Sequence, residues 1–457
     1  MKRIIVCMIW LLCVMGNAYG QQTLTLEECR GLAIRNNREL RISKEKVTEA
    51  GYDKKAAFTK YFPSLSATGA YLWNQKDIRL FDTGKLGPIG DLLPPDAKSA
   101  FLLDIQNIWI GGISLVQPVF MGGKIINYNL IAGYAKELAG SMNDLQLQHL
   151  IVLTDEAYWQ IISLVNKKKL ADAYVSLLRK MDGDVAEMIR EGVATQADGL
   201  SVKVRLNEAE VAQTKVENGL ALSRMALAQL CGLPLDDTPA LADENIDDFP
   251  SSRSAAAADI NEAFANRNEL KSLDLAFRIY QKRERLVLAD MLPNVAFVAN
   301  YLVTNPNSFN GFQHSFGGML NMGVMVNVPL SGWWEGTYRR NSARAATLIR
   351  KLEYEAAREK IALQVNQSVY KANEARKRVA ASLHNMENAK ENLRHATFGF
   401  EEGVIPALNL MEAQTAWVAA HSELIDAQIE AKLTDVYLGQ ALGRPPVATE
   451  EQHKNNR

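Results

Sequence analysis

An internal repeat is the feature that most restricts what this 457-residue chain can fold into. The segment 33–40 (AIRNNREL) resembles the segment 263–270 (AFANRNEL), which lies 230 positions later. Further along, the offset is 211, and it places Pro118 on Pro329. Because the offset falls by 19 between residues 72 and 118, the first copy has a longer loop there. The sequence therefore predicts two tandem copies of one structural unit.

Each copy is predicted to contain a helix, a β-hairpin, a long helix and a shorter helix. Thr25 and Glu28 form a capping box, which marks the start of a helix. Pro63 stops that helix, and a Gly-Val turn at 192–193 separates the two later helices. In the first copy the elements cover about 25–59, 62–119, 123–191 and 195–230, and in the second copy the β-hairpin covers 292–330.

The predicted helix lengths fit one another. At ~1.5 Å per residue, the long helix of the first copy is ~100 Å long and the two shorter ones are ~50 Å each. Two shorter helices stacked end to end therefore match one long helix. The segment 233–256 is rich in Asp, Pro and Ser, so it is predicted to link the two copies at mid-height, where the shorter helices meet.

The first 20 residues have the pattern of a secretory signal peptide. Two basic residues precede an apolar run over residues 4–15, and a small-residue cleavage site at 18–20 precedes Gln21. The run is too short to favour the alternative, a membrane anchor. Cys13 lies inside the run, where a lipidation site is not expected. The predicted division is a signal peptide 1–20, a first repeat 21–232, a linker 233–256, a second repeat 257–443 and a C-terminal tail 444–457.

The predicted strands alternate between apolar residues and small or polar ones. Leu65, Ala67, Tyr71 and Trp73 share one face in the first copy, and serine, threonine and alanine share the other. This alternation is typical of a strand between lipid and water, and equally of a soluble hairpin packed on its own helices. Aromatic residues at the strand ends nearest the helices favour the membrane, because they resemble an interfacial girdle. They are Tyr61, Phe62, Phe120, Trp333 and Trp334.

Four strands are too few to close a membrane barrel, which needs about eight or more. Open sheet edges cannot face lipid, so strands placed in a membrane require several chains to close the wall. After residue 20, no stretch of the sequence approaches the ~20 apolar residues of a transmembrane helix. The sequence therefore predicts a channel wall that several copies of the chain share.

The last helix of each copy carries a seven-residue repeat typical of a coiled coil. A periplasmic coiled-coil scaffold or adaptor would share this repeat, but it would not need the amphipathic strands. In the second copy, the two series of seam positions are Ala413, Ala420, Ala427, Thr434 and Ala441, and Trp417, Leu424, Ala431 and Leu438.

Composition and motifs argue against several classes of function. The 51 basic and 52 acidic residues balance, so nothing indicates nucleic-acid binding. The histidines lack the spacing of a metal site, and neither a phosphate loop nor a nucleophile motif is present. No catalytic residue, metal or cofactor is therefore predicted. Only Cys29 and Cys231 follow the signal peptide, which is too few for a disulfide framework, and the sequence leaves open whether they pair.

Together these patterns resemble the TolC-like outer membrane efflux protein family over about residues 24–445. The resemblance rests on the tandem repeat, on the helix–Pro–strand junctions at 62–65 and 292–295, and on the strand-to-helix corners at 117–123 and 328–332. It implies a mainly α fold with β structure. Long periplasmic coiled-coil helices would form an α-barrel, and four antiparallel strands per chain would contribute to a trimeric, twelve-stranded transmembrane β-barrel.

The resemblance also implies what such a protein does. It would be the passive exit duct of a tripartite efflux pump in the cell outer membrane, extending into the periplasm, and not an enzyme. Its partners would be outer membrane lipid, a periplasmic adaptor protein, an inner-membrane transporter and two further copies of the chain. Small-molecule efflux and type I protein secretion both fit, because the transporter selects the cargo.

In the family, the helix turns at the periplasmic tip engage the adaptor protein. The matching positions are Gly192 and Val193 in the first copy and Gly403 and Val404 in the second. A glycine at a helix end also supplies a left-handed turn, which is the alternative explanation for these residues.

The family narrows its tunnel just past the second turn, with acidic residues one helical turn apart. Asn409 and Glu412 occupy the matching positions, and Asp198 occupies the place of Asn409 in the first copy. The arginine and the tyrosine of the family's polar latch are Ile405 and Phe400 here. Since Phe400 cannot donate a hydrogen bond, the resemblance implies a constriction with half the acidic charge and without that latch.

Overall fold

The computed structural model describes residues 23–79, 94, 102–103, 105–236, 239–245, 258–310 and 312–444. The predicted signal peptide with Cys13, parts of the predicted linker, and all but the first residue of the predicted tail lie outside these residues. The first copy contains α2 (Leu26–Asn36), α3 (Arg38–Thr59), β1 (Ser64–Trp73), β2 (Ile78–Arg79), β3 (Leu102–Leu103), β4 (Asn107–Phe120), α6 (Lys124–Arg190) and α7 (Gln196–Cys231). A 3₁₀ helix, η3 (Ala242–Asn245), precedes the second copy, which contains α8 (Ile260–Asn266), α9 (Asn268–Ala289), β5 (Asn294–Asn305), β6 (Gly317–Asn327), α10 (Gly332–Glu401) and α11 (Ala407–Ala441).

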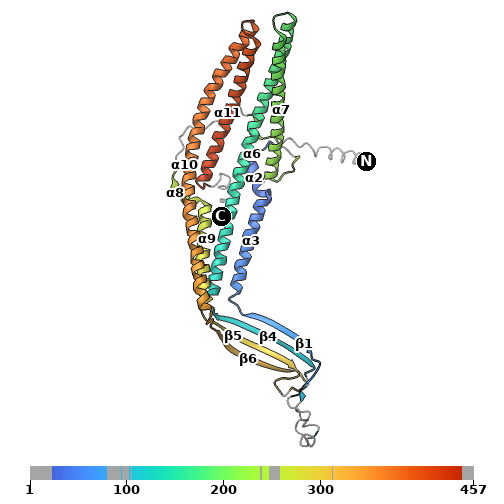
Figure 1. Cartoon of the computed structure of the whole chain (residues 1–457), viewed down its shortest axis with the longest axis vertical. Helices are drawn as coiled ribbons and strands as arrows, with labels where there is room; N and C mark the ends of the chain where they lie inside the picture. Colours follow the sequence, from blue (N-terminus) through green and yellow to red (C-terminus); the bar gives the residue numbers. More distant parts are fainter. Residues whose placement is uncertain are drawn as a thin grey trace, which may run out of the picture. The chain divides into compact units, whose positions relative to one another are not determined.

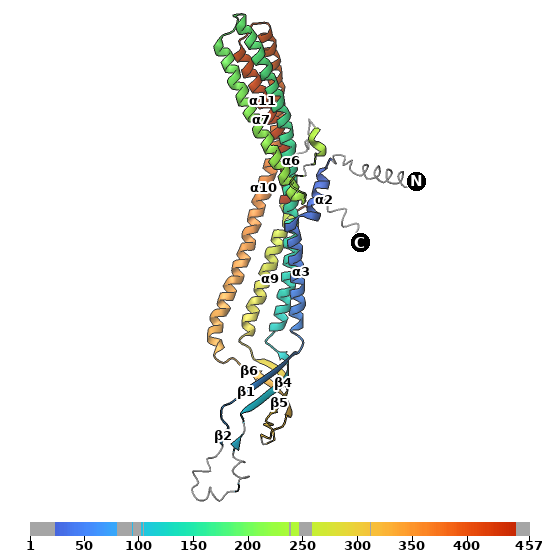
Figure 2. The ribbon, with the colours of Figure 1, turned by 90° about the vertical axis from the view of Figure 1, so that its right-hand side faces the viewer.

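Apart from the short β2–β3 pair, the two copies present the same order of elements (Figures 1 and 2). The predicted mainly helical fold with two tandem repeats and four long antiparallel strands is therefore confirmed. In both views the chain reverses direction between α6 and α7, and again between α10 and α11. None of the described helices combines the length and the apolar character that crossing a membrane requires.

The chain divides into two compact units that cut across the copies. The first unit consists of Met1–Val47, Ala139–Ser272 and Tyr354–Arg457, and the second of Thr48–Leu138 and Leu273–Glu353. Each unit therefore contains corresponding parts of both copies. The second unit holds the sheet, and the first holds the helix turns and the ends of the shorter helices.

The four long strands form one antiparallel sheet in the order β1-β4-β5-β6. The hairpin of the first copy, β1 with β4, and that of the second copy, β5 with β6, are joined through the β4–β5 pairing. A single two-stranded hairpin is marginally stable in water. The tandem repeat thus supplies the four strands that one copy could not provide.

The structure interrupts the helix predicted over residues 25–59, because α2 ends at Asn36 and α3 begins after Asn37. The backbone of Asn37 is extended (ψ 127°), and its Oδ1 accepts a hydrogen bond from the Leu40 N–H (3.1 Å). The Nδ2 groups of the two asparagines donate to the last carbonyl groups of α7, at Cys231 (3.2 Å) and Leu230 (3.4 Å). The break therefore supplies partners for carbonyl groups that a helix end leaves unpaired. We call this contact the first junction.

The second copy makes the corresponding contact, the second junction, with a different side chain. Arg267 separates α8 from α9, and only 7% of its side chain is exposed. Its Nη1 donates to the backbone oxygens of Gln440 (3.3 Å) and Ala441 (3.1 Å) at the end of α11, and its Nη2 donates to Glu269 (2.8 Å). A cation at this place also complements the negative end of the helix dipole.

A glycine in the left-handed conformation ends the shorter helix at each junction. Gly232 has φ 68° and Gly443 has φ 67°. A Cβ atom at residue 232 would lie 2.5 Å from the Cβ of Asn36, and one at residue 443 would lie 3.0 Å from the Cβ of Asn266. Both the backbone conformation and the available space therefore require glycine at these positions.

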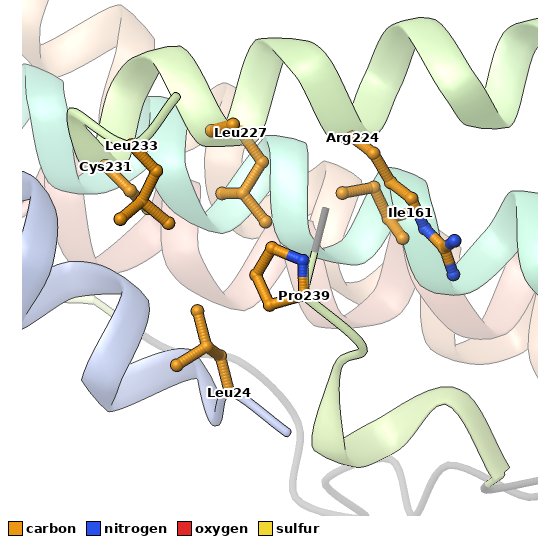
Figure 3. Close-up of a pocket in the computed structure, with 8 residues that line it drawn as sticks. Leu24, Ile161, Arg224, Leu227, Cys231, Leu233 and Pro239 are labelled. Carbon is orange, nitrogen blue, oxygen red and sulfur yellow. The ribbon is translucent and has the colours of Figure 1, made fainter. Parts of the chain in front are cut away.

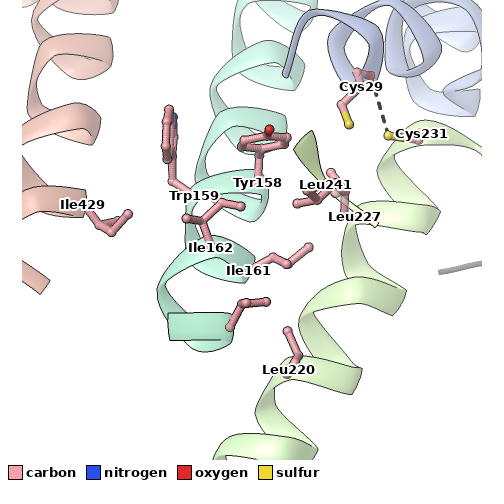
Figure 4. Packing of buried hydrophobic residues seen from close by; sticks show 11 residues of the cluster. Cys29, Tyr158, Trp159, Ile161, Ile162, Leu220, Leu227, Cys231, Leu241 and Ile429 are labelled. Atoms are coloured by element: carbon pink, nitrogen blue, oxygen red, sulfur yellow. Dashed lines mark hydrogen bonds between the residues drawn. The ribbon is translucent and has the colours of Figure 1, made fainter. Parts of the chain in front are cut away.

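The core of the first unit gathers around α2, α6 and α7. Leu24 forms a parallel bridge with Leu241, and Leu24 and Pro239 lie at the edge of a small cavity shown in Figure 3. Arg30 donates to both carboxylate oxygens of Asp155 (2.6 and 2.5 Å), which ties α2 to α6. The adjoining hydrophobic cluster (Figure 4) contains Cys29, Tyr158, Trp159, Ile161, Ile162, Val165, Leu220, Leu227, Cys231, Leu241 and Ile429.

The heptad positions of the last helix form a packed seam, as predicted. All five residues of the first series in α11 are buried, and none of the four in the second series is exposed. Small side chains along such a seam allow helices to approach closely. The buried members are Ala413, Ala420, Ala427, Ala431, Thr434, Leu438 and Ala441.

Replacing Gly232 with alanine should destabilise the protein more than the same change at Gly192, a left-handed glycine (φ 78°) with open space around it. Both variants lose about 1–2 kcal/mol through the left-handed conformation, and Gly232→Ala should lose a further ~1–3 kcal/mol through overpacking against Asn36. Thermal unfolding in detergent, followed by circular dichroism, measures both. Equal losses would show that the junction yields to the extra atom.

Candidate functional site

One face of the sheet presents a continuous apolar surface across all four strands. The strand register places Ala67, Ile113, Tyr301 and Leu320 side by side in one row. The neighbouring row consists of Leu65, Leu115, Ala299 and Met322. Most of these side chains are large and exposed. Soluble proteins rarely expose an apolar surface of this extent to water. The alternation predicted from the sequence thus gives one coherent face.

The opposite face carries a polar row. Ser66, Ser114, Asn300 and Asn321 lie side by side in the register. The Ser114 hydroxyl donates a hydrogen bond to the side-chain oxygen of Asn300 (2.6 Å). The Nδ2 of Asn300 in turn donates to the side-chain oxygen of Asn321 (3.0 Å). Side chains that bond to one another across three strands suit a surface lining a water-filled space.

Aromatic residues occupy both ends of the strands. The five predicted near the helices are all exposed, and the Trp333 indole N–H donates to the Met291 backbone oxygen (2.9 Å). At the far end, Tyr71, Trp73 and Trp109 are exposed as well, and the rings of Tyr71 and Trp109 lie 4.6 Å apart. A ten-residue strand such as β1 is ~30 Å long, and a tilt of ~40° reduces this to about the 25 Å height of an outer membrane apolar band.

The sheet has two open edges. β1 and β6 each pair with one neighbour only, and nearly all their residues are exposed. An edge strand presents unpaired N–H and C=O groups, which cannot remain exposed in hydrocarbon. The geometry therefore describes a segment of a wall rather than a closed wall.

The two turns between the paired helices have the same backbone hydrogen bonds. Gly192 N–H donates to the Ile189 oxygen (3.1 Å) and Val193 N–H to the Met188 oxygen (2.8 Å). Gly403 and Val404 form the equivalent pair of bonds in the second copy. This is the Schellman arrangement, in which a left-handed glycine ends the helix. Both glycines are left-handed, with φ 78° and 72°, so the turn accounts for the glycines but not for the valines.

Both turn valines point apolar surface toward solvent. Val193 is 68% exposed and Val404 is 76% exposed. Leu200 and Leu408, near the starts of α7 and α11, are exposed as well. Four exposed aliphatic residues at the two turns indicate a surface that a partner could cover.

The predicted constriction residues lie within the first two turns of the shorter helices α7 and α11. Asn409 and Glu412 are exposed on α11, on the side opposite the buried Leu410 and Met411. Asp198 instead closes a capping box, in which its Oδ2 accepts bonds from the Thr195 hydroxyl (2.6 Å) and N–H (2.9 Å). These bonds hold the pKa of Asp198 below its usual range, so its carboxylate stays charged at neutral pH.

The two residues that replace the family's polar latch belong to an apolar cluster. Phe400 is buried, and Ile405 packs against the same cluster. This cluster contains residues of all four helices near the turns. Its buried members are Met181, Val185, Val202, Phe400, Ala407, Leu410 and Met411.

Within the described ranges, no group of three or more His, Cys, Asp or Glu residues has the arrangement of a metal site.

Residues 260–444 match the family model described as outer membrane efflux protein. The resemblance to the TolC-like outer membrane efflux protein family is confirmed. Among solved structures, the chain is similar to CusC (15% identity, 92% of each chain, TM-score 0.76). It is also similar to VceC of Vibrio cholerae (14% identity, 92% of this chain and 96% of that chain, TM-score 0.75) and to the MtrE outer membrane channel of Neisseria gonorrhoeae (16% identity, 92% and 89%, TM-score 0.72). No curated relative matches the chain.

The structural similarity extends the family's fold from the matched second copy to nearly the whole chain. The family consists of outer membrane channel proteins rather than enzymes. This agrees with the predicted outer membrane location, with helices extending into the periplasm, and with the prediction that the chain has no catalytic role.

Three features escaped the sequence analysis. The far belt of Tyr71, Trp73 and Trp109 was not predicted, although the alternation places Tyr71 and Trp73 on the apolar face. The alternation places all four residues of the polar row on the polar face, but it does not show that they lie side by side. That needed the strand register. The apolar cluster at the turns joins segments more than 200 residues apart, which no local pattern reveals.

Replacing Ile113 with arginine should impair assembly in the outer membrane, whereas replacing its neighbour Ser114 with arginine should have a smaller effect. Ile113 lies in the apolar row and Ser114 in the polar row. An arginine on the lipid-facing side costs about 2–4 kcal/mol at mid-membrane, and loss of the Ser114 bond costs ~0.5–1.5 kcal/mol. The yield of oligomer extracted from outer membranes measures both. A larger loss for Ser114→Arg would reverse the assignment of the two faces.

Proposed function

We propose that three copies of the chain form an outer membrane channel-tunnel, the passive exit duct of a tripartite efflux pump for small molecules. An inner-membrane transporter would supply the energy, and a periplasmic adaptor protein would connect it to the channel. The observation that carries the proposal is the open four-stranded sheet with one apolar face, one polar face and two unpaired edges. A periplasmic scaffold has no use for such a sheet.

Barrel geometry supports more than two copies, and the number three comes from the resemblance to the TolC-like family. β1 and β6 run in opposite directions, because each step across the sheet is antiparallel. The β6 edge of one copy can therefore pair with the β1 edge of the next and continue the same pattern. Two copies would give eight strands, and side chains fill the interior of a barrel of that size. Three copies would give twelve strands, which leaves room for a passage.

The adaptor protein would bind at the two helix turns. Val193 and Val404 are exposed there on turns whose backbone bonds fix their direction. Apolar side chains held on a rigid turn lose little entropy when a partner covers them. Gly192 and Gly403 would then act through the turn that presents the valines, rather than through contact of their own.

The tunnel would narrow at Glu412 and Asn409, with Asp198 contributing charge from the first copy. Threefold symmetry would bring three copies of each residue around one axis. Because Glu412 is exposed in the single chain, its carboxylate is available to face the passage. Asp198 is held by its capping box, so its contribution would be a fixed charge rather than a mobile ligand.

Small molecules are the proposed cargo because the family model that matches the chain is one of efflux proteins. Type I protein secretion uses the same kind of duct and is the alternative. The two differ in the inner-membrane transporter, so identifying the transporter that co-purifies with the channel would distinguish them.

The test of the proposal is the size and activity of the extracted protein. The mature protein should be recovered from outer membranes only with detergent, with a mass about three times that of one chain. Planar bilayers containing the purified protein should show single-channel conductance. A stable monomer with its full strand content, or recovery from the soluble periplasmic fraction, would contradict the proposal.

Replacing Glu412 with glutamine should reduce cation selectivity and block by multivalent cations, each by several-fold. Like charges in a narrow mouth raise the local cation concentration, and the substitution removes three of them from a trimer. Asn409→Asp should have the opposite effect. The matched control is Glu423→Gln on the same helix, because Glu423 already bonds to Arg378 (2.9 Å). Unchanged selectivity and block in Glu412→Gln would exclude this residue from the constriction.

A further inference from the structure

Two cysteines that the proposed function does not use lie against each other in the first unit. Cys29 belongs to α2, and Cys231 is the last residue of α7. Their residues are 0% and 1% exposed, and both carry free thiols. The Cys231 Sγ lies 3.6 Å from the backbone oxygen of Cys29. Figure 4 shows the two side chains directed into the same space between α2 and α7.

The surroundings do not explain the pair as a metal site or as a requirement of packing. No third metal-binding side chain joins the two thiols among the described residues, and a structural metal site usually has four ligands. At the corresponding positions of the second copy, the repeat places Asp259 and Leu442. The second copy therefore forms the corresponding part of the fold without cysteines.

The first junction is also the weaker of the two in its hydrogen bonds. The second junction uses the buried cation Arg267, which donates to the end of α11 at 3.3 and 3.1 Å. The first junction uses two neutral asparagines, at 3.2 and 3.4 Å. Bonds to charged donors are stronger than neutral ones. A second link beside Cys231 would offset this difference.

We propose that Cys29 and Cys231 form a disulfide in the exported protein and thereby fasten α2 to the end of α7. The inference rests on the proposed location outside the cytoplasm, where disulfides form and persist. The bond would close a loop between residues 202 positions apart, which contains the hairpin strands β1 and β4 and the long helix α6 of the first copy. Closing such a loop lowers the conformational entropy of the unfolded chain and thereby stabilises the folded protein.

The chemistry is a thiol–disulfide exchange with an oxidant that itself carries a disulfide, such as an oxidised dithiol protein. One cysteine thiolate attacks a sulfur of that disulfide, which forms a mixed disulfide and releases the first thiol of the oxidant. The other cysteine thiolate then attacks the mixed disulfide, forms the Cys29–Cys231 bond and releases the second thiol. Two electrons pass to the oxidant, and the two protons lost by the cysteines are taken up by its thiols.

The exchange would occur before α2 packs onto α7. The cavity beside Cys231, lined also by Leu24 and Leu227 (Figure 3), has a volume of about 10 Å³, which is about the room of one water molecule. The neighbouring Cys231 thiol and burial raise the pKa of Cys29, whereas the Cys29 thiol lowers that of Cys231, so it is burial that keeps an oxidant from the packed pair. The same burial would protect the finished bond from reductants.

The test uses the full chain, expressed with its own leader and separated into soluble and outer membrane fractions. Each fraction is quenched with acid, denatured and treated with N-ethylmaleimide, with or without prior reduction, and its intact mass is measured. Without the predicted signal peptide the chain holds two cysteines, so the expected result is no added maleimide before reduction and two after it. Cys231→Ser is the matched control and should take up one maleimide without reduction.

One or two maleimides on the unreduced wild-type chain would overturn the disulfide, and so would a disulfide-linked dimer on a non-reducing gel. Free thiols in protein recovered from the outer membrane would refute this inference and leave the channel proposal intact. An oxidised pair in protein recovered from the soluble periplasmic fraction would support the disulfide and refute the channel.

Discussion

An unpaired strand edge in a membrane is the constraint on which the rest of this structure depends. Each exposed N–H or C=O group in hydrocarbon costs several kcal/mol, and β1 and β6 together expose two rows of them. The chain cannot remove these edges by itself, because its four strands are too few to close. The tandem repeat has already doubled the hairpin, and the remaining closure has to come from other copies.

The helices meet a second constraint of the same kind at the two junctions. A helix that ends halfway along a longer one leaves its last carbonyl groups beside another helix rather than in water. The chain interrupts that neighbouring helix in each copy, so that a side chain can reach the carbonyl groups. A continuous helix over residues 25–59 would have no side chain in this position.

The sequence was enough for the architecture but not for these contacts. The repeat, the strand alternation and the heptads each follow a regular period, so the element order, the two sheet faces and the helical seam were predictable. The break at Asn37 was not, because the cause lies nearly 200 residues away at the end of α7. The segment from Thr25 to Thr59 has no proline, and its single interruption depends on a tertiary contact.

In the candidate site, too, features with a local cause were predictable and features that depend on distant residues were not. The Gly-Val turns were predictable, since a left-handed glycine has a local cause, and the structure places all four residues as described. The environment of Phe400 was not, because its cluster draws on four separate helices. Only the absence of a hydroxyl could be read from the sequence, and the structure adds that apolar contacts take its place.

The two junctions show which parts of the repeat the fold requires. Gly232 and Gly443 have nearly the same φ, and both end their helices with the same pair of backbone bonds. One of the side chains beside them differs in size, charge and chemistry, because Asn37 corresponds to Arg267, whereas Asn36 corresponds to Asn266. Only glycine adopts this left-handed conformation freely where there is no room for a Cβ atom. A carbonyl group, in contrast, accepts a hydrogen bond from any donor within reach. The two copies therefore share the glycines and differ at one donor position.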